Sequence, residues 1–117
     1  MRTLILVAAL FGAVVAPARA QELSGTLKKI KDTGAITLGV RDSSLPFSYL
    51  DDKQKVVGYT IDICMKVLDE IKAELNLDKL ETKEIVVTSS TRIPLMANGT
   101  VDLECGSTTN NADRQKR

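Results

Sequence analysis

The sequence has no histidine and no tryptophan, and its only aromatic residues are two phenylalanines and two tyrosines. Without histidine, the chain cannot form a Ser-His-Asp catalytic triad or a metal site with histidine ligands. No other pairing of an activated nucleophile with a base stands out in the sequence. We therefore expect no catalytic residues, no bound metal and no cofactor.

The sequence also lacks an excess of charge of either sign. It has 16 basic and 15 acidic residues, and beyond residue 20 the balance is 14 to 15, a net charge of −1. This balance favours neither nucleic acid nor an anionic membrane surface as a partner. The overall content, 44% hydrophobic and 26% charged residues, is ordinary for one soluble domain.

A long apolar run occurs only at the N-terminus. Arg2 supplies the positive charge of a signal peptide, residues 4–15 supply its apolar stretch, and residues 18–20 (ARA) form a small-x-small cleavage site. A membrane anchor is the alternative, but a dozen apolar residues are too few to span a bilayer, which requires about 20. We predict that residues 1–20 are a signal peptide, cleaved after Ala20, and that the protein is exported.

Cysteine is scarce, with two residues in the chain. Cys64 falls on the apolar side of a predicted helix, where we expect a small buried side chain rather than a disulfide. Cys105 closes a predicted strand. Because an oxidising compartment permits disulfides, a Cys64–Cys105 bond stays open, as does pairing of Cys105 with a partner outside this chain.

From residue 22 onward, short β-branched runs alternate with helical patterns. The predicted elements are a helix at 22–32 stopped by Gly34, a buried strand at 35–40, a loop at 42–44, paired extended segments at 46–50 and 55–59, a helix from an N-cap at Thr60 to about Asn76, a strand at 82–87, a short helix at 92–98 and a strand at 101–105. This order predicts an α/β fold with an open, mainly parallel sheet flanked by helices. Because polar residues without a closing element follow, we expect residues 21–117 to be the first part of a larger unit.

Hydroxyl residues and arginines gather where the predicted strands end. Ser89 and Ser90 follow one strand and precede Arg92, while residues 107–109 (STT) follow the next strand and precede Arg114. Arg41 comes directly after the strand at 35–40. In open α/β sheets, ligands bind beyond the carboxyl ends of the strands. Guanidinium groups bind carboxylates bidentately, and three arginines exceed what one carboxylate needs, so the pattern predicts a ligand with two acidic groups.

Five motifs carry a resemblance to a known family. They are VRDSSLPFSY (residues 40–49), VVGYTID (56–62), STRIPL (90–95), NGTVD (98–102) and ECGSTTNN (104–111). In these motifs the chain resembles bacterial periplasmic solute-binding proteins of family 3, above all the glutamate/aspartate-binding components of ABC importers. The resemblance extends from Leu23 to Arg117, and it implies the N-terminal lobe of a bilobed fold, truncated before the second lobe.

The resemblance also implies ligand-binding roles for seven residues. They are Arg41, Ser89, Ser90, Arg92, Ser107, Thr109 and Arg114. Arg114, helped by Thr109, would hold the α-carboxylate of an amino acid, with Ser107 near its α-ammonium group. Arg41 and Arg92 would hold the side-chain carboxylate together with a hydroxyl from Ser89 or Ser90. Phe47 would form part of an apolar wall of the binding site.

By this resemblance, the protein is expected to be a periplasmic monomer that binds L-glutamate or L-aspartate for an ABC permease in the inner membrane. Two alternatives belong to other classes: an exported, dehydratase-like enzyme on the same fold, and the ligand-sensing domain of a receptor kinase or channel. The lack of a nucleophile paired with a base argues against the enzyme. The cleavable signal peptide, with no later apolar segment able to cross a membrane, argues against the receptor.

Overall fold

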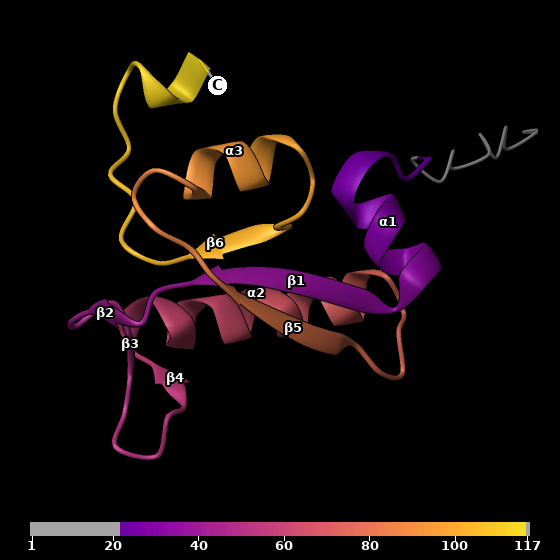
Figure 1. The fold of residues 1–117 in the computed structure, drawn as a ribbon. Coiled ribbons are helices and arrows are strands. Elements are labelled where there is room, and N and C mark those ends of the chain that lie inside the picture. Colours follow the sequence, from indigo (N-terminus) through magenta and orange to yellow (C-terminus); the bar gives the residue numbers. More distant parts are fainter. Residues whose placement is uncertain (1–21, 117) are drawn as a thin grey trace, which may run out of the picture.

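The computed structural model describes residues 22–116 (Figure 1). The predicted signal peptide, residues 1–20, lies outside the described residues. Within the described part, no helix combines the length and the apolar character needed to cross a membrane. The chain folds into a three-stranded parallel sheet with helices packed against it, and a small antiparallel sheet projects from one end (Figure 1).

The parallel sheet has the order β5 (Glu81–Val86), β1 (Ala35–Val40), β6 (Leu103–Cys105). The predicted strand at 35–40 is confirmed at both ends, and the other two begin or end within two residues of their predicted bounds. β1 is the central strand, and Ile36, Leu38 and Val40 on it are buried, which explains why its sequence has no charged residue. In register, Val40 pairs with Val86 on one side and with Cys105 on the other. The loops that follow all three strands therefore leave the same edge of the sheet.

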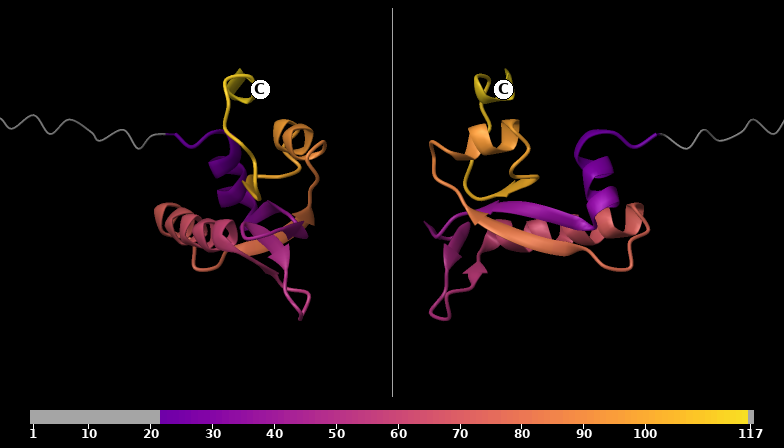
Figure 2. Two further views of the ribbon diagram at one scale, coloured as in Figure 1. Left: turned by 90° about the vertical axis from the view of Figure 1, so that its left-hand side faces the viewer. Right: turned by 45° about the vertical axis from the view of Figure 1, so that its right-hand side comes forward.

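Three helices pack on this sheet: α1 (Gly25–Thr33), α2 (Tyr59–Glu74) and α3 (Arg92–Ala97). α1 and α2 lie on one side of the sheet and α3 on the other (Figure 2). The main core lies between β1 and the first two helices, where Ile30, Leu38 and Leu68 are buried together. Gly34 ends α1 in the left-handed conformation, as its position predicted, with its N–H donating to the carbonyl of Ile30.

The prediction that Thr60 is the N-cap of α2 is wrong. The helix begins at Tyr59 and Gly58 occupies the cap position, with φ at 134°. A Cβ atom at position 58 would collide with the main-chain carbonyl of Phe47, and the N–H of Thr60 donates to that same carbonyl. The close approach of the loop at Phe47, rather than a capping side chain, therefore fixes the start of α2.

The small antiparallel sheet has the order β2 (Ser43–Ser44), β3 (Ser48–Leu50), β4 (Val56–Val57). The predicted pairing of the two extended segments is confirmed, since Tyr49 pairs with Val57. The predicted loop at 42–44 is wrong, because Ser43 and Ser44 form a strand that pairs with β3. Serine has little strand preference, so this strand exists only because β3 turns back beside it and offers backbone partners.

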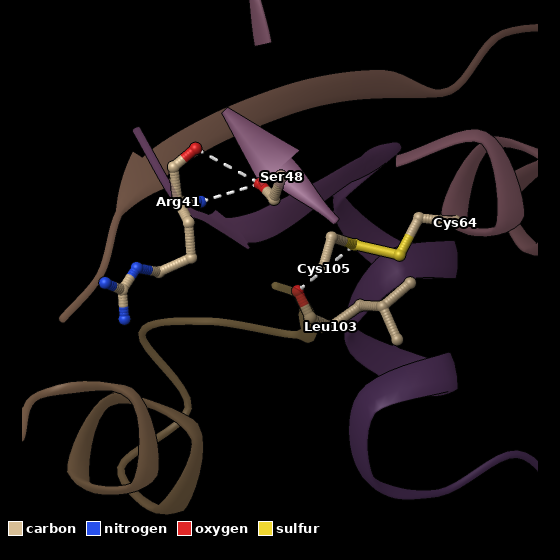
Figure 3. The surroundings of a disulfide bond; sticks show 5 residues. All are labelled: Arg41, Ser48, Cys64, Leu103 and Cys105. Carbon is tan, nitrogen blue, oxygen red and sulfur yellow. Dashed lines mark hydrogen bonds between the residues drawn. A yellow bond between two sulfur atoms is a disulfide. The ribbon is translucent and has the colours of Figure 1, made fainter. Parts of the chain in front are cut away.

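A disulfide joins Cys64 of α2 to Cys105 at the end of β6 (Figure 3). The expectation that Cys64 is buried is confirmed, at 4% exposure, but the expectation that it is unpaired is wrong. Parallel pairing places Cys105 beside Val40 in the sheet, and the buried face of α2 packs over it. This brings the two Cα atoms to 6.2 Å, within the usual range for a disulfide, across a sequence separation of 41.

Candidate functional site

The carboxyl edge of the parallel sheet brings together three loops that carry the predicted site residues. Arg41 follows β1 directly, residues 87–91 connect β5 to α3, and residues 106–113 follow β6. Arg114 begins a short 3-10 helix, η1 (Arg114–Lys116), which the sequence pattern did not predict. The three arginines are thus presented by three segments far apart in sequence.

Arg92 is the buried centre of this group, with 3% of its surface exposed. It is the first residue of α3, so its side chain meets the loops that follow both β5 and β6. Its Nε donates to the carbonyl of Thr88 at 3.2 Å and its Nη2 to Ser89 Oγ at 3.3 Å. Its Nη1 donates to Thr108 Oγ1 at 2.6 Å and lies 3.5 Å from Glu104 Oε1. These contacts hold the guanidinium plane in one orientation.

Burial lowers the pKa of Arg92 below its ordinary value, and the positive charges of Arg41 and Arg114 lower this pKa further. The carboxylate of Glu104 acts in the opposite direction. Arginine nonetheless keeps its charge in proteins, because its pKa begins so high. The three arginines therefore form an electrostatically coupled cluster, and additional negative charge at Arg92 would be favourable.

Arg41 lies beside Arg92, and its main chain is fixed by the buried hydroxyl of Ser48. Ser48 Oγ accepts from the Arg41 N–H at 2.8 Å and donates to the Arg41 carbonyl at 3.2 Å (Figure 3). The guanidinium donates to Ser89 Oγ at 3.4 Å, while its Nε is buried without a hydrogen-bond partner in the described part of the chain. Unpaired buried donors of this kind are rare in native structures.

Arg114 is held by its own loop. Its Nη1 donates to the main-chain carbonyl of Thr109 at 3.0 Å, and its backbone N–H donates to Asn111 Oδ1 at 3.0 Å. Thr109 therefore contacts Arg114 through its main-chain carbonyl.

The three predicted serines have different surroundings. Ser89 Oγ accepts from both Arg41 and Arg92, so it joins the two guanidinium groups. Ser90 Oγ instead pairs with Thr88 Oγ1 at 3.0 Å, within its own loop. Ser107 Oγ donates to Ser44 Oγ at 3.3 Å, linking the loop after β6 to the small sheet.

Two surface cavities flank this cluster. One has a volume of about 430 Å³ and is lined by Arg92, Ile93, Met96, Ala97, Glu104, Thr108 and Arg114. The other has a volume of about 520 Å³ and is lined by Phe47, Tyr59, Thr60, Glu104, Gly106, Ser107, Thr108 and Thr109. Both volumes suit a small molecule, and Glu104 and Thr108 border both cavities. Phe47 lines the second cavity, where the family resemblance implies an apolar wall.

The chain is similar in sequence to known proteins. Residues 36–117 match the family described as "Bacterial extracellular solute-binding proteins, family 3". The chain belongs to this family. The family 3 chain is 60% identical over 103 residues to the L-glutamate/L-aspartate-binding protein of Pseudomonas aeruginosa, a match that covers 87% of this chain and 34% of that protein. It is 53% identical over 92 residues to the glutamate/aspartate import solute-binding protein of Escherichia coli K12, covering 79% and 30% respectively.

The family 3 chain thus spans about a third of the length of the curated relatives it matches. These relatives are solute-binding proteins rather than enzymes, which supports the expectation that the chain has no catalytic role. The predicted resemblance to the glutamate/aspartate-binding branch of the family is confirmed.

Solved structures show the same fold. An arginine-bound form of domain 1 from TmArgBP matches with a TM-score of 0.63 and 22% identity, covering 75% of this chain and 64% of that one. An ancestral cationic amino acid solute binding protein matches with a TM-score of 0.68 and 22% identity, covering 80% and 38%. The predicted fold class, a lobe of the periplasmic-binding-protein type, is confirmed.

Sequence reasoning about this family 3 chain missed two side chains that contact Arg92. Thr108 belongs to the hydroxyl cluster after β6 but was given no role, and Glu104 was quoted only as part of a motif. A signal for Glu104 was present, because a carboxylate between Leu103 and Cys105 in a half-buried strand requires a partner. Its partner, Arg92, lies 12 residues earlier and could be identified only from the fold.

Proposed function

We propose that this chain forms the N-terminal lobe of a receptor that captures L-glutamate or L-aspartate and delivers it to an ABC permease, without chemistry. One observation carries the proposal: Arg92, almost fully buried, is coupled to Arg41 and Arg114 at the carboxyl edge of the sheet. Three guanidinium groups beside one carboxylate leave an excess of positive charge. A small ligand with two carboxylates would balance it.

The names of the relatives support the choice of ligand. The Pseudomonas protein is called an L-glutamate/L-aspartate-binding protein, and the Escherichia protein a glutamate/aspartate import solute-binding protein. The word "import" in the name of the Escherichia protein, together with the family, supports an ABC permease as the partner. No cofactor or metal takes part in the proposed activity, and we propose that the protein acts as a monomer.

Within the site, we propose that Arg41, Arg92 and Ser89 bind the side-chain carboxylate. Ser89 already joins the two guanidinium groups, whereas Ser90 is engaged within its own loop, so Ser89 is the better candidate of the pair.

We propose that Arg114 and Thr109 bind the α-carboxylate and that Ser107 lies near the α-ammonium group. The bond from Arg114 to the Thr109 carbonyl holds the guanidinium close to the loop. Ser107 and Thr109 line the same cavity, as two groups that share one end of a ligand would.

We also propose that residues 1–20 are removed after Ala20 and that the mature protein, beginning at Gln21, works in the periplasm. The family description as extracellular supports export. Intact-mass measurement of periplasmic material would decide the point. A species that retains Met1 would contradict it.

The test of function is calorimetric titration of the full-length protein with glutamate, aspartate and glutamine. We expect saturable binding of the two dicarboxylic amino acids and weaker binding of glutamine, because the amide cannot balance the arginine cluster. Incubation with glutamate, followed by mass analysis of the ligand, should return it unchanged. Conversion to a product would support the enzyme alternative instead.

A further inference from the structure

The hydrogen-bonding capacity of Arg92 is mostly used within the lobe. A guanidinium group carries five N–H donors. Nε donates to Thr88, one Nη2 donor goes to Ser89, and the two Nη1 donors face Thr108 and Glu104. Among the contacts of the described residues, one Nη2 donor therefore remains for a ligand. Arg92 contributes mainly its charge and one hydrogen bond.

Glu104 lies close to both Arg92 and Arg41. Its side chain is 16% exposed, and its Oε1 lies 3.5 Å from Arg92 Nη1. A Cβ atom at position 106 would collide with the Glu104 carboxylate and would lie 2.8 Å from Arg41 Cγ. The carboxylate therefore folds over the backbone of Gly106, beside the side chain of Arg41.

Glu104 is also placed to act on a ligand. It borders both cavities that flank the cluster. Among the acidic residues of the described part, Glu104 is the one whose charge acts on the pKa of Arg92. A ligand carboxylate bound at Arg92 and Arg41 would thus lie close to a fixed negative charge, and like charges in a partly desolvated site repel.

We infer that Glu104 is the internal counter-ion of the arginine cluster and limits how strongly the site prefers a carboxylate to an amide. This inference rests on the proposed function and deepens it. In the free protein, Glu104 compensates the repulsion among Arg41, Arg92 and Arg114. In the complex it opposes the ligand side-chain carboxylate, which keeps the preference for glutamate moderate. Glu104 therefore determines specificity through the charge it places beside Arg92.

The decisive variant is Glu104→Gln in the full-length protein, because the amide keeps the shape and an acceptor for Arg92 but removes the charge. The measured quantity is the ratio of the glutamine Kd to the glutamate Kd, obtained by calorimetry. We expect this ratio to rise about tenfold, equivalent to about 1.4 kcal/mol. Both constants come from one preparation, so an inactive fraction does not change the ratio. The melting temperature of the ligand-free variant should fall.

Two controls separate charge from hydrogen bonding. Glu104→Asp keeps the charge, and its ratio should stay close to that of the wild type. Thr108→Val removes a hydrogen bond of Arg92 without changing any charge. The ratio of this variant should fall, because a less firmly held Arg92 weakens the binding of glutamate more than that of glutamine. If Glu104→Gln does not fold, Glu104→Met is a second uncharged variant of similar length, with the same rise expected.

The outcomes distinguish this inference from the proposed function. If the wild type binds neither glutamate nor aspartate, the proposed function fails, and the role of Glu104 fails with it. If the wild type binds glutamate but the uncharged variants leave the ratio unchanged or lower it, Glu104 is only a structural partner of Arg92. In that case the inference is overturned and the proposed function stands.

Discussion

At the residue scale, burial distinguishes the three arginines. Arg92 is 3% exposed and bonded to both loops around it, whereas Arg41 and Arg114 are only partly buried and have fewer partners. A buried cation with an ion-pair partner supports the fold as well as any ligand. Substitution should therefore affect binding and stability differently at the three positions.

Arg114→Ala should weaken the binding of every amino acid by at least about tenfold, because all amino acids share the α-carboxylate. Arg41→Ala should strongly weaken the binding of glutamate and aspartate but leave that of glutamine unchanged, because glutamine has no second carboxylate. Loss of one partner from a desolvated charge pair costs about 2–5 kcal/mol. Calorimetric titration of both full-length variants with glutamate and glutamine measures these changes. Equal weakening of the two ligands by Arg41→Ala would contradict the two-carboxylate site.

Arg92→Ala should lower the free energy of unfolding by about 3 kcal/mol or more, because it leaves Glu104 half-buried without its cation. Urea unfolding in the absence of ligand measures this change. Lys28→Ala is the matched control, since Lys28 pairs with Asp32 on the exposed surface of α1 and should contribute less than about 1 kcal/mol. Equal effects of the two substitutions would show that the Arg92–Glu104 pair is not structural.

At the element scale, β6 connects the core to the site. Cys105 ends the strand and bonds to α2, while the next residues turn into the loop that carries Ser107 and Thr109. The disulfide thus fixes the end of β6 against α2 immediately before the loop that carries Ser107 and Thr109 (Figure 3). Its loss should affect both the stability of the lobe and the position of this loop.

The double variant Cys64→Ser, Cys105→Ser should lose about 4 kcal/mol of unfolding free energy, the chain-entropy estimate for a closed loop of this length. Unfolding in urea, with and without a reducing agent, measures it. The reducing agent should destabilise the wild type and leave the double variant unchanged. A wild type that is insensitive to complete reduction would show that the bond adds no stability.

At the scale of the whole molecule, we propose that the described lobe supplies one wall of a binding site. Arg92 and Arg114 line one surface cavity at the edge of the sheet, and Glu104 and Thr108 connect it to a second. We propose that residues 21–117 are the N-terminal lobe and that a second lobe closes on the ligand, as expected for a bilobed fold. Closure of two lobes excludes water from the ligand and strengthens its polar contacts.

Residues 21–117 alone should therefore bind glutamate weakly, with a Kd well above the micromolar range if binding is measurable at all. Calorimetry on this fragment, with the full-length protein as the control, measures the difference. Circular dichroism should establish first that the fragment is folded. Submicromolar binding by the folded fragment would show that the second lobe is dispensable.

The sequence by itself determined the main helices and strands and their order, but not the strand at Ser43–Ser44 or η1. The β-branched run at 35–40 and the helical spacing of Ile61, Cys64 and Leu68 are local patterns, and each indicates which residues become buried. Because the strands are parallel, the residues that follow them must meet at one edge. The gathering of Arg41, Arg92 and Arg114 was therefore predictable from the sequence.

Only the tertiary structure decided which side chains pair. The Cys64–Cys105 bond depends on how α2 lies over β6, and the strand at Ser43–Ser44 depends on the return of β3. The contact between Glu104 and Arg92 depends on how α3 lies against β6. Local patterns specify which face of an element is buried, but they do not specify what packs against it. The partners of Arg92, and with them the balance of charge in the site, are thus set by long-range packing.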